Sequence, residues 1–265
     1  MMWNLAIGGA IIGVAALWAA AVWRNGRRTA RHIGRGDARA GSVLFVEPVR
    51  WLFIVWGFNA MFAALRREGL GHSVHLFRWS RSAGSLLVLP DLMRRHRLDV
   101  KARRLARRIE TLFVSHPGAP LHVVAYSTGV YIAFEAIRQL APGARLTSVI
   151  ALHGTVSPHY DVAGVASRAG VVLNVYGRKD WLINGIGPWL FGTNDRVHSP
   201  ACGMVGLRDV SANVQQRAWQ PSDWRQGYWG DHFTVMAVPW LRAHVVPILV
   251  ASERTGCEFE AFPAG

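Results

Sequence analysis

Residues 121–129 read LHVVAYSTG, and this stretch decides the fold. Its first six residues, dominated by apolar side chains, predict a strand that is covered on both faces. A serine follows at position 127, and the apolar run after it predicts a helix over 130–140. A serine at a sharp turn from strand to helix holds its hydroxyl above the edge of the sheet. These residues alone leave a second interpretation open, in which Ser127 is an ordinary helix N-cap.

Working outward from this stretch, strand and helix patterns alternate along the chain. Further strands are expected at 51–56, 73–79, 146–152 and 171–176, and further helices at 61–68, 99–115 and 233–250. This alternation predicts an α/β fold with a doubly wound, mainly parallel sheet. Hydrophobic residues make up 51% of the chain and charged residues 17%, which argues against disorder. We therefore expect one α/β domain over residues 42–265.

The Ala125-Tyr126-Ser127-Thr128-Gly129 turn, in this alternating pattern, resembles the α/β-hydrolase superfamily of serine esterases and lipases. Ala125 stands where that family usually has glycine. The family orders its triad along the chain as serine, acid and histidine. The resemblance implies Ser127 as nucleophile, Asp180 after strand 171–176 as the acid, and His232 before the last helix as the general base.

The resemblance also implies two backbone donors for an oxyanion. One is the N–H of Thr128, next to the nucleophile, and the other is the N–H of Phe58. Phe58 lies in a Gly-Phe-Asn loop after the 51–56 run, with Trp56 where the family has histidine. A substrate pocket is expected from four aromatic residues: Trp56, Tyr126, Trp181 and Trp189.

Each assignment has an alternative. Asp180 could be a turn residue paired with Arg178, with Asp195 or Asp209 as the acid instead, and His232 could be a packed core residue. A metal site at 153–161, which holds His153, His159 and Asp161, is disfavoured because the segment is irregular. No metal or organic cofactor is expected, and the chain has no phosphate-binding loop of the Gly-Lys-Ser/Thr type. The apolar run 181–191 is expected to pack in the core, the alternative being an acyl-binding wall or a lid that dips into a membrane.

The N-terminus has an apolar run followed by arginines. Residues 2–23 contain no charged side chain, and at about 1.5 Å per residue they are long enough to cross a bilayer. We expect a transmembrane anchor over 1–23 and a basic juxtamembrane linker over 24–41. The arginines after the apolar run predict an N-terminus outside and a catalytic domain in the cytoplasm.

The net charge of +14 indicates an anionic neighbour. An anionic lipid surface fits the anchor, whereas nucleic acid is disfavoured because the arginines of 94–108 follow the polar face of an amphipathic helix.

The function predicted from these features is hydrolysis of a carboxylic ester or thioester, with lipid-derived esters among the candidate substrates, through an acyl-serine intermediate. The main alternative is a catalytically inactive member of the same fold that acts as a membrane-bound binding or scaffold protein. The departures at Ala125 and Trp56 keep that alternative open.

Overall fold

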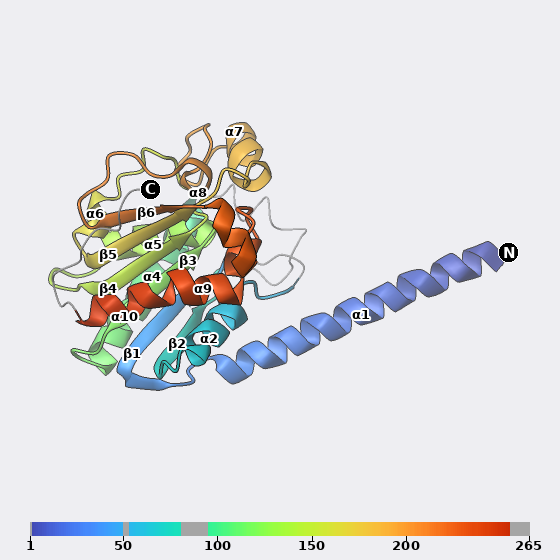
Figure 1. Cartoon of the computed structure of the whole chain (residues 1–265), viewed down its shortest axis with the longest axis horizontal. Coiled ribbons are helices and arrows are strands. Elements are labelled where there is room, and N and C mark those ends of the chain that lie inside the picture. Colours follow the sequence, from blue (N-terminus) through green and yellow to red (C-terminus); the bar gives the residue numbers. More distant parts are fainter. Residues whose placement is uncertain (1, 50–52, 81–94, 255–265) are drawn as a thin grey trace.

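Six parallel strands form the centre of the molecule in the order β2-β1-β3-β4-β5-β6 (Figure 1). The computed structural model describes residues 2–49, 53–80 and 95–254, and the side chains of 11–49, 53–80 and 97–251. The strands are β1 (Asp37–Val46), β2 (His72–Phe77), β3 (Leu121–Tyr126), β4 (Leu146–Leu152), β5 (Ala169–Tyr176) and β6 (Val214–Ala218).

Helices cover both faces of this sheet. One face carries α4 (Arg95–Ser115), α5 (Thr128–Arg138) and α6 (Ala163–Ala166), whose apolar side chains share one core with the strands. The other face carries α2 (Phe58–Arg67), α9 (Val238–His244) and α10 (Val246–Arg254) over a second core. The predicted doubly wound parallel sheet is confirmed, and this arrangement is consistent with the α/β-hydrolase fold.

Short helices line the loops between these elements. They are η2 (Leu182–Ile186), α7 (Gly187–Phe191), α8 (Cys202–Val205), η3 (Pro221–Gln226) and η4 (Thr234–Met236). The helix expected over 233–250 is divided into η4, α9 and α10, with a proline in the first turn of both α9 and α10.

The strand expected at 51–56 is wrong for the residues that are described there. Phe53 lies in a turn with a φ of 63°, and residues 54–56 have no regular structure, while 51 and 52 lie outside the described residues. The strand position is taken by β1, whose residues 42–46 pair with both β2 and β3. Val55 instead packs over the sheet in the core beneath α2, so burial of the apolar run does not require it to join the sheet. Strand β6 was not predicted from the sequence.

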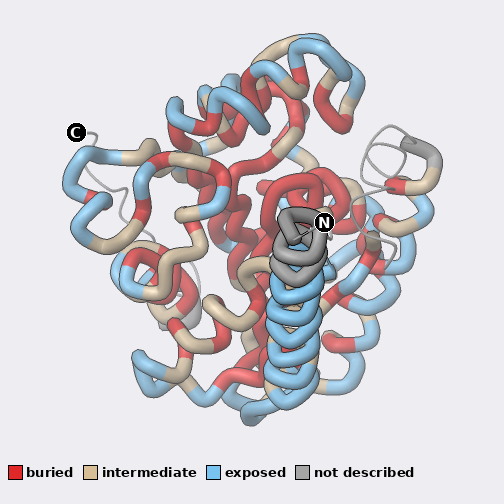
Figure 2. Tube along the Cα trace, turned by 90° about the vertical axis from the view of Figure 1, so that its right-hand side faces the viewer, coloured by how far each residue is buried: buried red, intermediate tan, exposed pale blue. Residues whose placement is uncertain are grey.

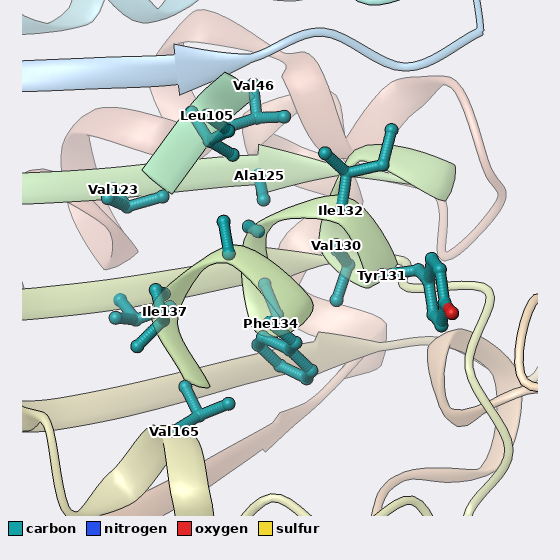
Figure 3. Close-up of a cluster of buried hydrophobic side chains, with 14 of the residues drawn as sticks. Val46, Leu105, Val123, Ala125, Val130, Tyr131, Ile132, Phe134, Ile137 and Val165 are labelled. Atoms are coloured by element: carbon teal, nitrogen blue, oxygen red, sulfur yellow. The ribbon is translucent and has the colours of Figure 1, made fainter. Parts of the chain in front are cut away.

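The core beneath the serine turn is built by α5 packing onto β3. Figure 3 shows Val130, Phe134 and Ile137 directed towards the sheet and its neighbouring helices. All three side chains are fully buried. Tight packing here fixes the start of α5, and therefore the position of the turn before it.

Helix α1 (Met2–His32) projects from the domain, and its described side chains are mostly exposed (Figures 1 and 2). It continues through residues 24–32, which were predicted as linker, and residues 37–41 of that linker begin β1. Only the last turns of α1 dock on the domain, where Asn59 of α2 donates a hydrogen bond to buried Thr29. In the part of the chain that the structure describes, no helix combines the length and apolarity of a membrane span, so the predicted transmembrane anchor is not supported.

Candidate active site

Ser127 sits at the turn between β3 and α5, in a strained backbone conformation. Its φ of 57° and ψ of −130° lie outside the regions that residues with a side chain usually occupy. Its N–H donates to the carbonyl of Leu152 on the neighbouring strand, at 2.9 Å. The expectation that Ser127 follows a buried strand and begins a helix agrees with the structure.

Gly129 allows this turn to lie close to the sheet. A β-carbon at this position would lie 2.7 Å from the carbonyl oxygens of Val46 and Glu47, at the end of β1. Such a distance is too short for a real contact, so only glycine permits α5 to start there. The small residue two positions after the serine therefore has a direct steric cause.

The structure brings Ser127, His232 and Asp180 together. The Ser127 hydroxyl lies 3.0 Å from Nε2 of His232, and Nδ1 of His232 lies 2.7 Å from Oδ2 of Asp180. All three residues are buried. They come from three loops after β3, β5 and β6, and the carboxyl ends of parallel strands meet at one edge of a sheet.

His153 is a further member of this site that the sequence analysis did not assign to it. It follows β4, has a φ of 47°, and is fully buried. Its Nδ1 lies 2.6 Å from Oδ2 of Asp180, and its Nε2 lies 2.6 Å from the hydroxyl of Tyr228. The available signal was its position at the end of a strand predicted to be parallel to the others.

Three donors converge on one oxygen of Asp180. Besides the two histidines, the side-chain amide of Asn184 donates to Oδ2 at 2.6 Å and also donates to the backbone carbonyl of His153 at 3.1 Å. Tyr228 donates its hydroxyl proton to Nε2 of His153, which leaves Nδ1–H to donate to Asp180. The result is a continuous chain of hydrogen bonds from Tyr228 to Ser127.

The pKa values follow from this arrangement. Burial by itself raises the pKa of Asp180, but the hydrogen bonds from His153 and His232 outweigh it and lower the pKa to about 2. Burial lowers the pKa of His153 more than the neighbouring carboxylate raises it. At neutral pH, Asp180 is therefore ionised and His153 is neutral.

The same three residues, His153, Asp180 and His232, form a buried group of potential metal ligands. Their donor atoms are spaced for hydrogen bonds, however, because Oδ2 of Asp180 is 2.6 Å from one ring nitrogen and 2.7 Å from the other. Two atoms bound to one zinc ion at about 2.0 Å in tetrahedral geometry would lie about 3.3 Å apart. The spacing fits shared protons better than a shared metal ion.

The two alternative candidates for the catalytic acid, Asp195 and Asp209, contact residues outside this site. Asp195 accepts hydrogen bonds from the N–H and the hydroxyl of Ser157, and Asp209 is exposed beside His159 at 3.6 Å. Asp180 bonds to the histidines, whereas the alternative paired it with Arg178. The candidate metal residue Asp161 lies beside Arg138 on the surface.

The two residues proposed to donate to an oxyanion are both buried. Thr128 is the first residue of α5, and Phe58 is the first residue of α2. The ring of Phe58 packs edge-on against Phe45 at 6.2 Å between centroids. The assignment of their N–H groups to an oxyanion stays a prediction.

The four predicted pocket residues have different environments. Tyr126 is buried and donates its hydroxyl proton to the backbone carbonyl of His232 at 2.6 Å, so it fixes the backbone that carries this histidine. Trp56 contacts Phe233, at 5.9 Å between ring centroids. Trp181 and Trp189 are 56% and 63% exposed, so the expected core packing of the 181–191 segment is wrong for these two residues.

No protein-family model matches this chain, and no curated protein sequence matches it either. Among solved structures, it is similar to a dienelactone hydrolase-like promiscuous phosphotriesterase from metagenomic libraries, with 19% identity and a TM-score of 0.44 over 82% of this chain and 87% of that one. It is also similar to a Trichoderma reesei cutinase bound to a phosphonate inhibitor, with 16% identity, 92% of each chain covered and a TM-score of 0.41.

A third similar structure is an α/β serine hydrolase without a lid from Xanthomonas campestris, at 15% identity and a TM-score of 0.44 over 83% of this chain and 84% of that one.

Proposed function

We propose that this protein is a serine hydrolase that cleaves a carboxylic ester or thioester through an acyl-serine intermediate. The observation that carries the proposal is the hydrogen-bonded chain from the Ser127 hydroxyl through His232 to Asp180, with distances of 3.0 Å and 2.7 Å. A serine hydroxyl is a poor nucleophile unless an adjacent base removes its proton. A buried imidazole held by an ionised carboxylate is such a base.

In the proposed reaction, His232 takes the proton from Ser127 as the oxygen attacks the carbonyl carbon of the substrate. The carbonyl π bond breaks as the new C–O bond forms, which places the electron pair on the oxyanion. The carbonyl then re-forms as the bond to the alcohol or thiol breaks, and His232 delivers the proton to this leaving group. A water molecule, deprotonated by His232, attacks the acyl-serine in the same way, and the bond to Ser127 breaks to release the acid and restore the hydroxyl. Asp180 holds the imidazole in the required tautomer and stabilises its charged form.

The backbone N–H groups of Thr128 and Phe58 are the proposed donors to the oxyanion. Support for Thr128 comes from its place at the N-terminus of α5, directly after the nucleophile, where the helix dipole favours negative charge. Loss of one such donor costs about 3 kcal/mol of barrier in related chemistry. The proposal for Phe58 is supported by its place as the first residue of α2, directly after Gly57.

A fluorophosphonate probe, which phosphonylates activated serines, tests the proposal on the full chain. We expect labelling of the wild type and none in Ser127→Ala. Ser157→Ala is the matched control, because Ser157 is also buried and donates its hydroxyl to an aspartate, Asp195. Labelling that persists in Ser127→Ala, or no wild-type labelling at any pH from roughly 6 to 9, would contradict the proposal and favour a non-catalytic binding protein.

Attachment to a membrane, with the catalytic domain in the cytoplasm, is a separate proposal. Its support is the exposure of apolar side chains on α1, where Leu17 is 75% exposed and Ile12 is 71% exposed. Fractionation of cells followed by a carbonate wash tests it. A chain that stays in the pellet agrees with integral attachment, and a chain released into the supernatant contradicts it.

A further inference from the structure

A basic groove lies where the last turns of α1 meet the beginning of α2. It has a volume of about 810 Å³. We call it the arginine groove, and its charged and polar walls include Arg24, Arg27, Arg28, Arg31, Arg35 and Asn59. It is separate from the site at Ser127, and the proposed hydrolysis uses none of these residues.

The groove has a defined shape because α1 docks through one row of side chains. Asn25 accepts a hydrogen bond from the N–H of Val55 at 3.0 Å, and Asn59 donates to Thr29 at 2.9 Å. His32 completes the row, with its ring stacked on Phe62 at 3.9 Å between centroids. Positions 25, 29 and 32 lie on one face of a helix, so the docked face is fixed.

The arginines form the adjacent row. Arg24, Arg28 and Arg31 follow the same i, i+4, i+7 spacing, and all three are exposed. Within the described part of the chain, no carboxylate forms an ion pair with any of the five arginines of the groove. Several arginine side chains thus line one hollow without a paired carboxylate among the described residues. Guanidinium groups bind phosphate through paired hydrogen bonds, so phosphate is the ligand chemistry that this groove fits.

The part of α1 that precedes the groove indicates which phosphate source fits best. Its described apolar side chains are exposed, with Ile11 at 64% and Val14 at 68%. Trp23 stands between these residues and the arginines, and Arg27 lies over its ring at 4.6 Å. An apolar stretch, then a tryptophan, then arginines is the order that hydrocarbon, interface and phosphate layers present in a membrane. A soluble phosphate ligand would leave the apolar side chains without a role.

The direction of α1 relates this groove to the sheet edge that carries the site. Asn25 meets Val55, just before α2, whereas His32 meets Phe62 further along α2. Towards its own N-terminus, α1 therefore runs towards the N-terminus of α2, which follows the carboxyl end of β1. Figure 1 shows α1 projecting far beyond the domain in that direction.

We propose that the arginine groove binds the phosphate groups of anionic phospholipids and holds the carboxyl edge of the sheet towards the lipid surface. The consequence for substrate delivery, that Ser127 would act on esters at that surface, rests on the proposed function. The binding itself does not, since it requires only the arginines and the docked helix.

Flotation of the full chain with vesicles tests the binding. The measured quantity is the ratio of partition coefficients for vesicles with about 30% phosphatidylglycerol in phosphatidylcholine and for phosphatidylcholine alone. This ratio isolates the anionic preference from any apolar insertion by α1. The variant is Arg28→Ala with Arg31→Ala. The matched control is Arg104→Ala with Arg107→Ala, an exposed i, i+3 pair on α4 that removes the same charge.

We expect the ratio to fall roughly 30-fold in the groove variant and by less than about threefold in the control. An equal fall in both variants would show diffuse charge attraction and overturn the proposal, as would a wild type without anionic preference. Groove-dependent binding of inorganic phosphate, or of duplex DNA, without any vesicle preference would also overturn it. Probe labelling of Ser127 in the same samples keeps the two proposals apart, because loss of labelling counts only against the hydrolase.

Discussion

His153 offers the sharpest test of the hydrogen-bond chain around Asp180. We consider His153→Gln, because glutamine can still donate to Asp180 and accept from Tyr228 but cannot take up a proton. The wild-type imidazole is fully buried between these two partners, and burial lowers its pKa. The variant therefore removes a side chain that can take up a proton, while it can keep hydrogen bonds to both Asp180 and Tyr228.

The sign of the pH effect follows from linkage. An unfolded histidine has a pKa of about 6.5, whereas His153 in the folded chain resists protonation. Below pH 6.5 the unfolded state takes up a proton that the folded state does not, so stability is present above that pH and is lost as the pH falls. If His153 stays neutral in the folded chain, the free energy of unfolding of the wild type falls by about 1.4 kcal/mol when the pH is lowered from about 7.5 to about 5.5.

The glutamine side chain has no such titration. At about pH 7.5 we expect His153→Gln to be about 1–2 kcal/mol less stable than wild type, because its hydrogen bonds are less well placed. At about pH 5.5 the difference shrinks by about 1.4 kcal/mol, so the two proteins have nearly equal stability. Urea unfolding followed by tryptophan fluorescence measures both values. The exposed His198→Gln is the matched control for the exchange of histidine for glutamine itself.

One result would refute this reasoning directly. If the difference between wild type and His153→Gln is the same at both pH values, the folded chain protonates His153 as readily as the unfolded chain does. The neutral assignment would then fail, and with it the view that His153 donates from Nδ1 while it accepts from Tyr228.

Three further predictions concern the turn, the histidine support and the exposed aromatic segment. Gly129→Ala places a methyl group 2.7 Å from two backbone oxygens, so we expect a loss of about 1–3 kcal/mol in thermal unfolding together with slower probe labelling. Gly71→Ala, whose β-carbon would have its nearest contact at 4.0 Å, should change stability by less than about 1 kcal/mol. Tyr126→Phe removes a buried 2.6 Å hydrogen bond and should cost about 1–2 kcal/mol in urea unfolding, and a cost near zero would contradict its supporting role. Trp181→Ser and Trp189→Ser should change the free energy of unfolding by less than about 0.5 kcal/mol but reduce turnover of long-chain esters more than of short-chain esters. Equal losses on both ester lengths would argue against an acyl-binding wall.

The central strands and the serine turn could be predicted because their signals are local. Strands β3 and β4 have the predicted bounds, since continuous apolar runs flanked by turn residues mark strands that are buried on both faces. Likewise Asp180 follows β5, and His232 lies shortly before α9, as the resemblance implied. These positions depend mainly on residues that are close along the chain.

Two apolar runs near the N-terminus show where local signals fail. Residues 43–46 and 51–56 are both apolar in the sequence, yet among the residues that the structure describes in these two runs only those of the first pair with β2 and β3. The second run buries Val55 against the face of the sheet instead. Which run enters a sheet depends on its neighbours in space, and periodicity alone does not contain that information.

The sequence by itself determined an alternating α/β chain with a serine at a strand-to-helix turn, because side-chain pattern and steric limits act over a few residues. Only the tertiary structure decided that His153 and Tyr228 join Asp180, at separations of 27 and 48 residues along the chain. It also decided that the arginines after Trp23 line a groove against α2, where a linker was expected. Such groupings arise when distant elements pack, since packing brings together side chains that no local pattern relates.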